Sequence, residues 1–173
     1  MTNPLQHLYA DFNTGDPAEK HANLADFPRM IDVELTSSCN FRCRMCPTGL
    51  LALGRPATFM ARETFTTIID QCAGRLEAMR FIGWGEDMLH PEALEFIHMA
   101  SEAGILTHIN TNGSKVTAEK ALNLCSAGLD SIKFSFQGVD RESYKEMRGK
   151  DFFEGLLDAI EIMRAARRAT SNL

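Results

Sequence analysis

Short apolar segments alternate four times with amphipathic segments along this chain, and the alternation constrains the fold more than any other feature. Each apolar segment has the length of a strand, and each amphipathic segment has apolar residues at helical spacing. Because a helix must carry the chain back before a parallel strand can follow, this pattern predicts an α/β fold. The expected strands are 31–36, 78–82, 105–110 and 131–137, and the expected helices are 62–73, 91–104, 117–127 and 152–169.

The predicted strands each have an apolar side and a polar side. Side chains alternate along a strand, so Lys133, Ser135 and Gln137 share one side of the fourth strand while the apolar residues share the other. If the apolar sides pack on the helices, the opposite face of the sheet is lined by polar groups. A barrel interior built only for packing is filled by Val, Ile and Leu. This pattern therefore favours a site, and an amphipathic sheet with one wet face is the alternative.

Three cysteines with the spacing CxxxCxxC follow the first predicted strand: Cys39, Cys43 and Cys46. Three thiolates on one short loop suit a 4Fe-4S cluster and leave one iron without a protein ligand. The bacterial ferredoxin run has two residues in each gap and a fourth cysteine, so simple electron transfer fits less well. The other cysteines, Cys72 and Cys125, fall on apolar faces of predicted helices, and we expect them in the core.

Zinc and disulfides are the alternatives for these cysteines. A structural zinc site needs four closed ligands, and only distant histidines such as His90 or His108 would complete one. A disulfide framework would need an even count in a secreted chain, whereas this chain has five cysteines. Its start, residues 1–10, lacks the basic and apolar regions of a secretory leader. We therefore expect free cysteines in a reducing cytoplasm, with zinc kept as an alternative.

Length and charge limit the number of domains and the kinds of partner that this chain can have. The chain has 173 residues, of which 45% are hydrophobic, which is enough for one globular domain. Its net charge of -5 argues against a nucleic-acid surface, because phosphate binding needs concentrated Lys and Arg. No apolar run has the length needed to cross a bilayer. We expect a partner that is neither nucleic acid nor membrane.

The cysteine spacing, with hydrophobic Met45 directly before Cys46, resembles the signature of the radical S-adenosylmethionine (SAM) superfamily. Other segments resemble the same family: 83–86 after the second strand, 110–113 at the end of the third and 135–138 at the end of the fourth. The likeness runs from about residue 28 to residue 157. It implies a partial TIM-like (β/α) barrel with its active site at the C-terminal ends of the strands.

The resemblance also implies the cofactors and their sites. In this family three cysteines hold a 4Fe-4S cluster, here Cys39, Cys43 and Cys46, and SAM chelates the open iron through its amino and carboxylate groups. Met45 would lie beside the adenine. No protein side chain is expected to act as a catalytic group. The residues expected to contact SAM are Met45, Gly83, Gly85, Glu86, Asn112, Ser135 and Gln137.

The implied activity is that of an oxidoreductase of the radical SAM type. The reduced cluster passes an electron to SAM, and the 5'-deoxyadenosyl radical that results takes a hydrogen atom from a substrate. The substrate is unknown and would be a small molecule or a peptide. A flavodoxin-type or ferredoxin-type electron donor is implied as well.

The sequence departs from the family in its number of strand-helix units, because it has four where a typical core has six. We expect residues 1–27 to form an N-terminal extension and 28–173 to form an incomplete core, a piece of a longer protein or half of a shared site. The fourth strand would then be an open edge that invites pairing. An inactive or partner-dependent cluster-binding fragment is the alternative function, and a zinc-binding module is a further one.

Overall fold

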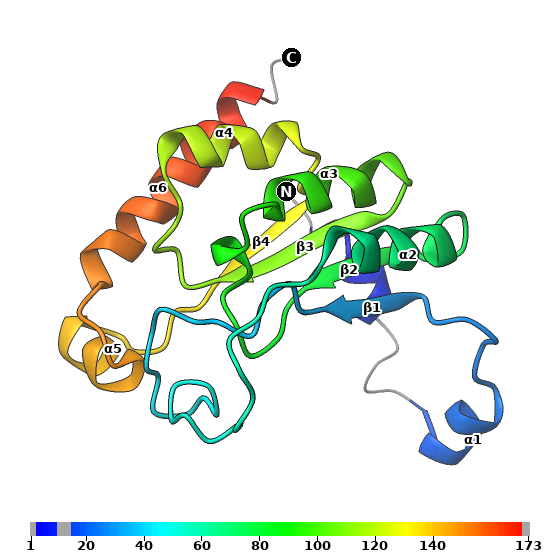
Figure 1. The fold of residues 1–173 in the computed structure, drawn as a ribbon, viewed down its shortest axis with the longest axis horizontal. Helices are drawn as coiled ribbons and strands as arrows, with labels where there is room; N and C mark the ends of the chain where they lie inside the picture. Colours follow the sequence, from blue (N-terminus) through cyan, green and yellow to red (C-terminus); the bar gives the residue numbers. More distant parts are fainter. Residues whose placement is uncertain (1–2, 10–14, 171–173) are drawn as a thin grey trace.

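The computed structural model describes residues 3–9 and 15–170, and its centre is a sheet of four parallel strands (Figure 1). The strands are β1 (Met30–Val33), β2 (Ala78–Phe81), β3 (Leu106–Thr111) and β4 (Ser131–Phe134). They lie side by side in the order of the sequence, which is the arrangement of a barrel and not of a doubly wound sheet. The predicted α/β fold with four strand-helix units is confirmed.

Four helices pack on one face of the sheet and form the main core with it (Figure 1). They are α2 (Arg62–Cys72), α3 (Ala93–Glu102), α4 (Ala118–Ser126) and α6 (Phe153–Thr170). The rings of Phe65 in α2 and Phe96 in α3 stack with their centroids 4.4 Å apart. Cys72 is buried in this core, and the partly buried Cys125 packs against it. The prediction that both cysteines belong to the core is confirmed.

The other helical segments are short: η1 (Gln6–Tyr9), α1 (Pro17–Ala22), η2 (Asp87–Leu89) and α5 (Arg141–Arg148). Helix α5 was not among the predicted helices. It begins with a capping box in which the Asp140 carboxylate accepts from the Ser143 backbone N–H at 2.8 Å. It ends at Gly149, whose φ of 65° is the left-handed conformation that favours glycine.

Two predicted strands are longer than the observed ones. β1 ends at Val33 and β4 at Phe134, three residues before each predicted end. Beyond Val33 the backbone bonds to side chains of a neighbouring loop, because the N–H groups of Leu35 and Thr36 donate to the Asp87 carboxylate. The helix predicted from residue 91 begins two residues later, after a turn in which the Glu92 N–H donates to the His90 ring.

The second face of the sheet carries the predicted row of polar side chains. Asp32, Arg80 and His108 are neighbours in register on β1, β2 and β3. Arg80 donates to both carboxylate oxygens of Asp32, at 2.6 and 2.7 Å. Residues 3–9 of the predicted N-terminal extension also contact the core, because Leu5 is buried and Arg80 donates to the Tyr9 hydroxyl. The polar row is confirmed.

The sheet has an unpaired edge along β4. Within the described residues β4 pairs only with β3, through the register that places Ile132 beside Ile109. The open edge predicted for the fourth strand is therefore observed. No helix in this described part of the chain is both long enough and apolar enough to cross a membrane.

Candidate cofactor site

The cysteine loop follows β1 and is held in shape by close backbone packing. The Cys46 N–H donates to the Cys43 carbonyl at 3.1 Å, and the Leu50 N–H donates to the Cys46 carbonyl at 2.9 Å. Gly49 lies directly on this turn, and a Cβ there would stand 2.4 Å from the Cys43 carbonyl oxygen. Only glycine fits at this contact. The three cysteines therefore sit on a tightly packed turn.

The cysteine loop also packs against α5 and forms a backbone hydrogen bond with it. Phe41, between the first two cysteines, is buried against Tyr144 of α5 and Leu156 of α6. The Arg44 N–H donates to the Met147 carbonyl at the end of α5, at 3.0 Å. A second core, separate from the one between sheet and helices, thus anchors the cysteine loop.

The three cysteines line a cavity of about 220 Å³ at the C-terminal ends of the strands. The loops after all four strands contribute to its wall. All ten residues that the sequence singled out line this one cavity: Cys39, Cys43, Met45, Cys46, Gly83, Gly85, Glu86, Asn112, Ser135 and Gln137. Ile82, Trp84, Asn110 and Arg148 complete the wall. Their common location is a finding about placement, and their roles toward a cofactor stay predictions.

The glycines after β2 are required by close contacts with the segment that follows β1. A Cβ on Gly83 would stand 2.4 Å from Cγ of Glu34, and one on Gly85 would stand 1.8 Å from the Thr36 carbonyl oxygen. The Glu34 carboxylate accepts from the N–H groups of Trp84 and Gly85, at 2.6 and 3.1 Å. Burial acts to raise the pKa of Glu34, but these bonds and Arg55 outweigh it and hold the pKa below its usual value. Glu34 was not among the predicted site residues, although it falls on the polar side of the predicted first strand.

Glu86 joins the ends of β2 and β3. Its carboxylate is 3% exposed and accepts from the Thr111 hydroxyl at 2.6 Å and from the Asn112 N–H at 2.7 Å. Burial raises the pKa of Glu86, and these two bonds partly offset the rise. The carboxylate thus fixes the wall of the cavity and faces it at the same time.

Asn112 links β3 to the cysteine loop through a residue that the sequence analysis missed. The Asn112 amide donates to the Asn40 side-chain oxygen at 2.8 Å, and the Asn40 amide donates to the Ser114 hydroxyl at 2.8 Å. Asn40 stands next to Cys39, so this chain of bonds fixes the first cysteine relative to β3. Its polar side chain inside the cysteine spacing is the signal that would have pointed to it.

The loop after β4 supplies Ser135 and Gln137. The Ser135 N–H donates to the Thr111 carbonyl at 2.8 Å, which extends the pairing with β3 past the strand end. The Gln137 side-chain oxygen accepts from Arg148 of α5 at 2.8 Å. Arg148 is buried and was not among the predicted site residues. Its spacing of four residues from buried Tyr144 on one helix face is the signal that was available.

Two thiols of the site, those of Cys39 and Cys43, are harder to ionise in the folded chain. Burial raises the pKa of Cys39 and of Cys43, and the charge of Arg148 opposes the rise at both. Thiolate is the form that binds metal, so loading of the site must release protons.

The donor set fits an iron-sulfur cluster. Within the part of the chain that the structure describes, no three thiol, imidazole or carboxylate groups lie close enough together to hold one metal ion. A 4Fe-4S cluster is bound differently, because each thiolate takes its own iron. Cys39, Cys43 and Cys46 around one cavity, with a buried guanidinium beside them, supply three thiolates and a counter-charge for such a group.

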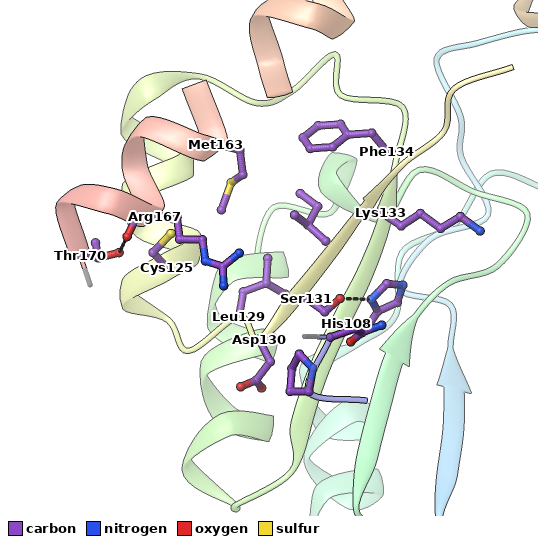
Figure 2. A pocket seen from close by; sticks show the side chains of 13 residues that line it. His108, Cys125, Leu129, Asp130, Ser131, Lys133, Phe134, Met163, Arg167 and Thr170 are labelled. Carbon is purple, nitrogen blue, oxygen red and sulfur yellow. Dashed lines mark hydrogen bonds between the residues drawn. The ribbon is translucent and has the colours of Figure 1, made fainter. Parts of the chain in front are cut away.

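A larger cavity, of about 720 Å³, lies along the open edge of β4 (Figure 2). Ser131 and Lys133 of β4 and Met163 of α6 are among the residues that line it, and His108 Nδ1 lies 2.9 Å from the Ser131 hydroxyl there. None of the ten predicted site residues belongs to its lining. The chemistry-bearing residues gather instead in the smaller cavity at the strand ends.

Fold and site together define a class of protein: a parallel α/β partial barrel with a three-cysteine loop at the C-terminal end of its first strand. Residues 33–173 match the family model of the radical SAM superfamily, and the chain belongs to that superfamily. Members of this superfamily use a 4Fe-4S cluster and SAM, which are the two cofactors that the sequence predicted.

Two relatives of the chain are longer proteins with enzyme names. AdoMet-dependent heme synthase of Methanosarcina barkeri is 29% identical over 83% of this chain and 41% of its own length. GTP 3',8-cyclase of Chlorobaculum tepidum is 33% identical over 85% of this chain and 45% of its own length. The chain thus spans less than half the length of these two curated relatives.

A solved structure shows the same fold. SuiB of Streptococcus suis, bound to the precursor peptide SuiA, superposes with a TM-score of 0.69 at 17% identity. The superposition covers 86% of this chain and 33% of SuiB. The predicted partial TIM-like barrel is confirmed by this likeness.

Proposed function

We propose that the chain is the core of a radical SAM enzyme, which binds a 4Fe-4S cluster through Cys39, Cys43 and Cys46 and binds SAM in the same cavity. One observation carries the proposal: the three cysteines selected by their spacing and the seven residues implied by the family resemblance, from all four strand ends, line a single cavity. Belonging to the superfamily supports the same reading.

When bound, the reduced cluster supplies one electron to SAM, whose carbon-sulfur bond breaks to give methionine and a 5'-deoxyadenosyl radical that takes hydrogen from the substrate. The protein supplies binding, orientation and exclusion of water. The cysteine turn sets the position of the cluster thiolates. Glu86 carries a carboxylate that an ammonium group would contact, and Gly83 and Gly85 bring backbone close to the cavity.

The remaining proposed SAM contacts come from the other loops. Met45 is 45% exposed at the rim of the cavity, where a soft side chain suits a flat base. Asn112, Ser135 and Gln137 supply amide and hydroxyl groups, which suit a ribose and a carboxylate. Each of these side chains lines the same wall as the cysteines.

For the substrate we propose a small molecule or a peptide, without choosing between them. The relatives are named for both kinds: a GTP cyclase for a nucleotide, and SuiB with its precursor peptide. The proposed reductant is a flavodoxin-type or ferredoxin-type donor in the cytoplasm.

The test is anaerobic reconstitution with iron and sulfide, followed by incubation with SAM and dithionite and an assay for 5'-deoxyadenosine. We expect the wild-type chain to form the product and Cys43→Ala to form none. Cys125→Ala is the matched control, because Cys125 lies in the other cavity, and we expect it to retain product formation.

A partner-dependent cluster module is the second candidate, and the open β4 edge favours it. In that case the wild-type chain would take up iron and sulfide but form no 5'-deoxyadenosine. Zinc without iron or sulfide after anaerobic purification would contradict both proposals and support a zinc module.

A further inference from the structure

Arg148, the last residue of α5, holds a buried cation against the cysteine cavity. Its side chain is 7% exposed, and it lines the same wall as the three cysteines. The guanidinium is held at two points: Nη1 donates to the Gln137 side-chain oxygen at 2.8 Å, and Cζ lies 5.1 Å from the centroid of the Phe41 ring. The position of the charge is therefore fixed.

This cation lacks the anion that its burial calls for. None of the ion pairs within residues 3–9 and 15–170 includes Arg148. Its Nε is buried without a hydrogen bond. The Tyr144 hydroxyl lies close to the guanidinium, which opposes the rise that burial causes in the pKa of Tyr144. A buried charge without a paired anion and a buried N–H without an acceptor are costly to the folded chain. Both indicate that an anionic acceptor occupies the cavity when the site is loaded.

The charge of Arg148 interacts with ionisable groups of the cysteine site. Its positive charge acts on the thiols of Cys39 and Cys43 and on the carboxylate of Glu86. Glu86 already accepts from Thr111 and the Asn112 N–H, so it is tied to the end of β3. The thiols are the groups that become anionic when the site is loaded.

We propose that Arg148 is the positioning residue for the cluster that Cys39, Cys43 and Cys46 would hold. Its guanidinium balances the negative charge of the thiolate-bound cluster, and its Nε–H donates to a sulfur atom of that cluster. The inference rests on the proposed function. Charge and hydrogen bonds at the sulfurs are the means by which a protein sets the reduction potential of such a cluster.

The test is a redox titration followed by electron paramagnetic resonance, without SAM, on the reconstituted wild-type chain and on Arg148→Met. Loss of the buried charge makes reduction harder, so we expect the potential to become more negative. The expected change is at least tenfold in the reduction equilibrium, which is about 59 mV for a one-electron couple. Iron and sulfide content, measured on the same samples, is expected to fall in the variant.

Two further variants separate charge from position. Arg148→Lys keeps the charge without the planar group, and we expect a smaller shift in potential than with methionine. Arg44→Met removes an arginine from the same loop region, but this one has a side chain that is 63% exposed and is paired with Glu146. We expect it to leave the potential unchanged, because solvent screens its charge. Should Arg148→Met fail to fold by circular dichroism, the shift in Arg148→Lys decides.

The outcomes separate this inference from the proposed function. A wild-type chain that takes up no iron and sulfide would overturn both. A wild-type cluster whose potential is the same in Arg148→Met would overturn the inference alone. An unchanged potential combined with weaker SAM binding would assign Arg148 to SAM instead of the cluster, and would also overturn it.

Discussion

Asp87 is a buried acid next to the site whose charge state affects the stability of the folded chain. Its side chain is 1% exposed below the end of β1, and burial raises its pKa to about 7. Bonds from the N–H groups of Leu35 and Thr36 act in the opposite direction, while the charges of Glu86 and Glu34 add to the rise. The folded chain therefore binds the Asp87 proton more tightly than the unfolded chain does.

This pKa predicts the pH dependence of unfolding. Between the ordinary value near pH 4 and pH 7 the unfolded chain loses the proton first, so the free energy of unfolding falls as the pH rises. Asp87→Asn keeps an oxygen for the two N–H groups and removes the titration. Between pH 5 and pH 8 we expect the wild type to lose roughly 2 to 3 kcal/mol more than the variant. Urea denaturation at both pH values measures this difference.

Asp26→Asn, at an exposed position, is the control, and it should follow the wild type at both pH values. Equal pH dependence in Asp87→Asn and wild type would show that Asp87 is not protonated in the folded chain at pH 5.

At the residue scale, the sequence predicted where the site lies but not which contacts hold its residues in place. The cysteines, Glu86 and Ser135 could be found because the spacing and the family resemblance pointed to them at the ends of predicted strands, where parallel sheets place their sites. Asn40 and Arg148 were missed because their importance comes from burial and partners, which are tertiary properties. An arginine at a helix end is normally solvent-exposed, so only the fold reveals this buried one.

Among the elements, α5 is the one on which the cysteine loop depends most. Gly149 ends it in the left-handed conformation and lies against the loop, where a Cβ would stand 2.2 Å from the Arg42 carbonyl oxygen. Gly149→Ala therefore meets both backbone strain and a steric clash with backbone. We expect a loss of at least about 2 kcal/mol in the free energy of unfolding, together with reduced cluster uptake.

Gly104 offers a matched control for this prediction. Its φ is 74°, close to that of Gly149, but no atom lies within 4 Å of a Cβ built on it. Gly104→Ala isolates the strain of the backbone, for which we expect about 1 kcal/mol and normal cluster uptake. Equal losses in the two variants by urea denaturation would mean that the contact with Arg42 is relieved without cost.

Helix α5 was missed because apolar periodicity, which predicted the strands and the core helices, is absent from it. The long helices and the strands were predicted because their apolar residues repeat at the periods of 3.6 and 2. In residues 141–148 only Tyr144 and Met147 are apolar, so no periodic stripe marks the helix. Its capping box at Asp140 was readable but weak without such a stripe. The strand ends were overestimated because hydrogen bonds from other loops, such as those to Asp87, decide where pairing stops.

At the scale of the whole molecule, the open edge of β4 predicts self-association. Within residues 3–9 and 15–170 no further strand pairs with this edge, which lies beside a cavity of about 720 Å³ and forms a surface on which another strand can add. We expect the fraction of dimers and larger species to increase with protein concentration. Light scattering after size-exclusion chromatography measures it across a dilution series. A chain that remains monomeric at every concentration while it cleaves SAM would contradict this prediction.

The hydrogen bond between the Arg44 N–H and the Met147 carbonyl can form only after α5 has been synthesised. During synthesis, a chain extended only to Gly128 already contains all three cysteines but not the helix that holds their loop. Closing a contact of such long sequence separation is slow compared with local folding. The thiols are thus present on the ribosome well before their final arrangement is, and a cluster bound before α5 is made would sit on a loop that this contact does not yet hold.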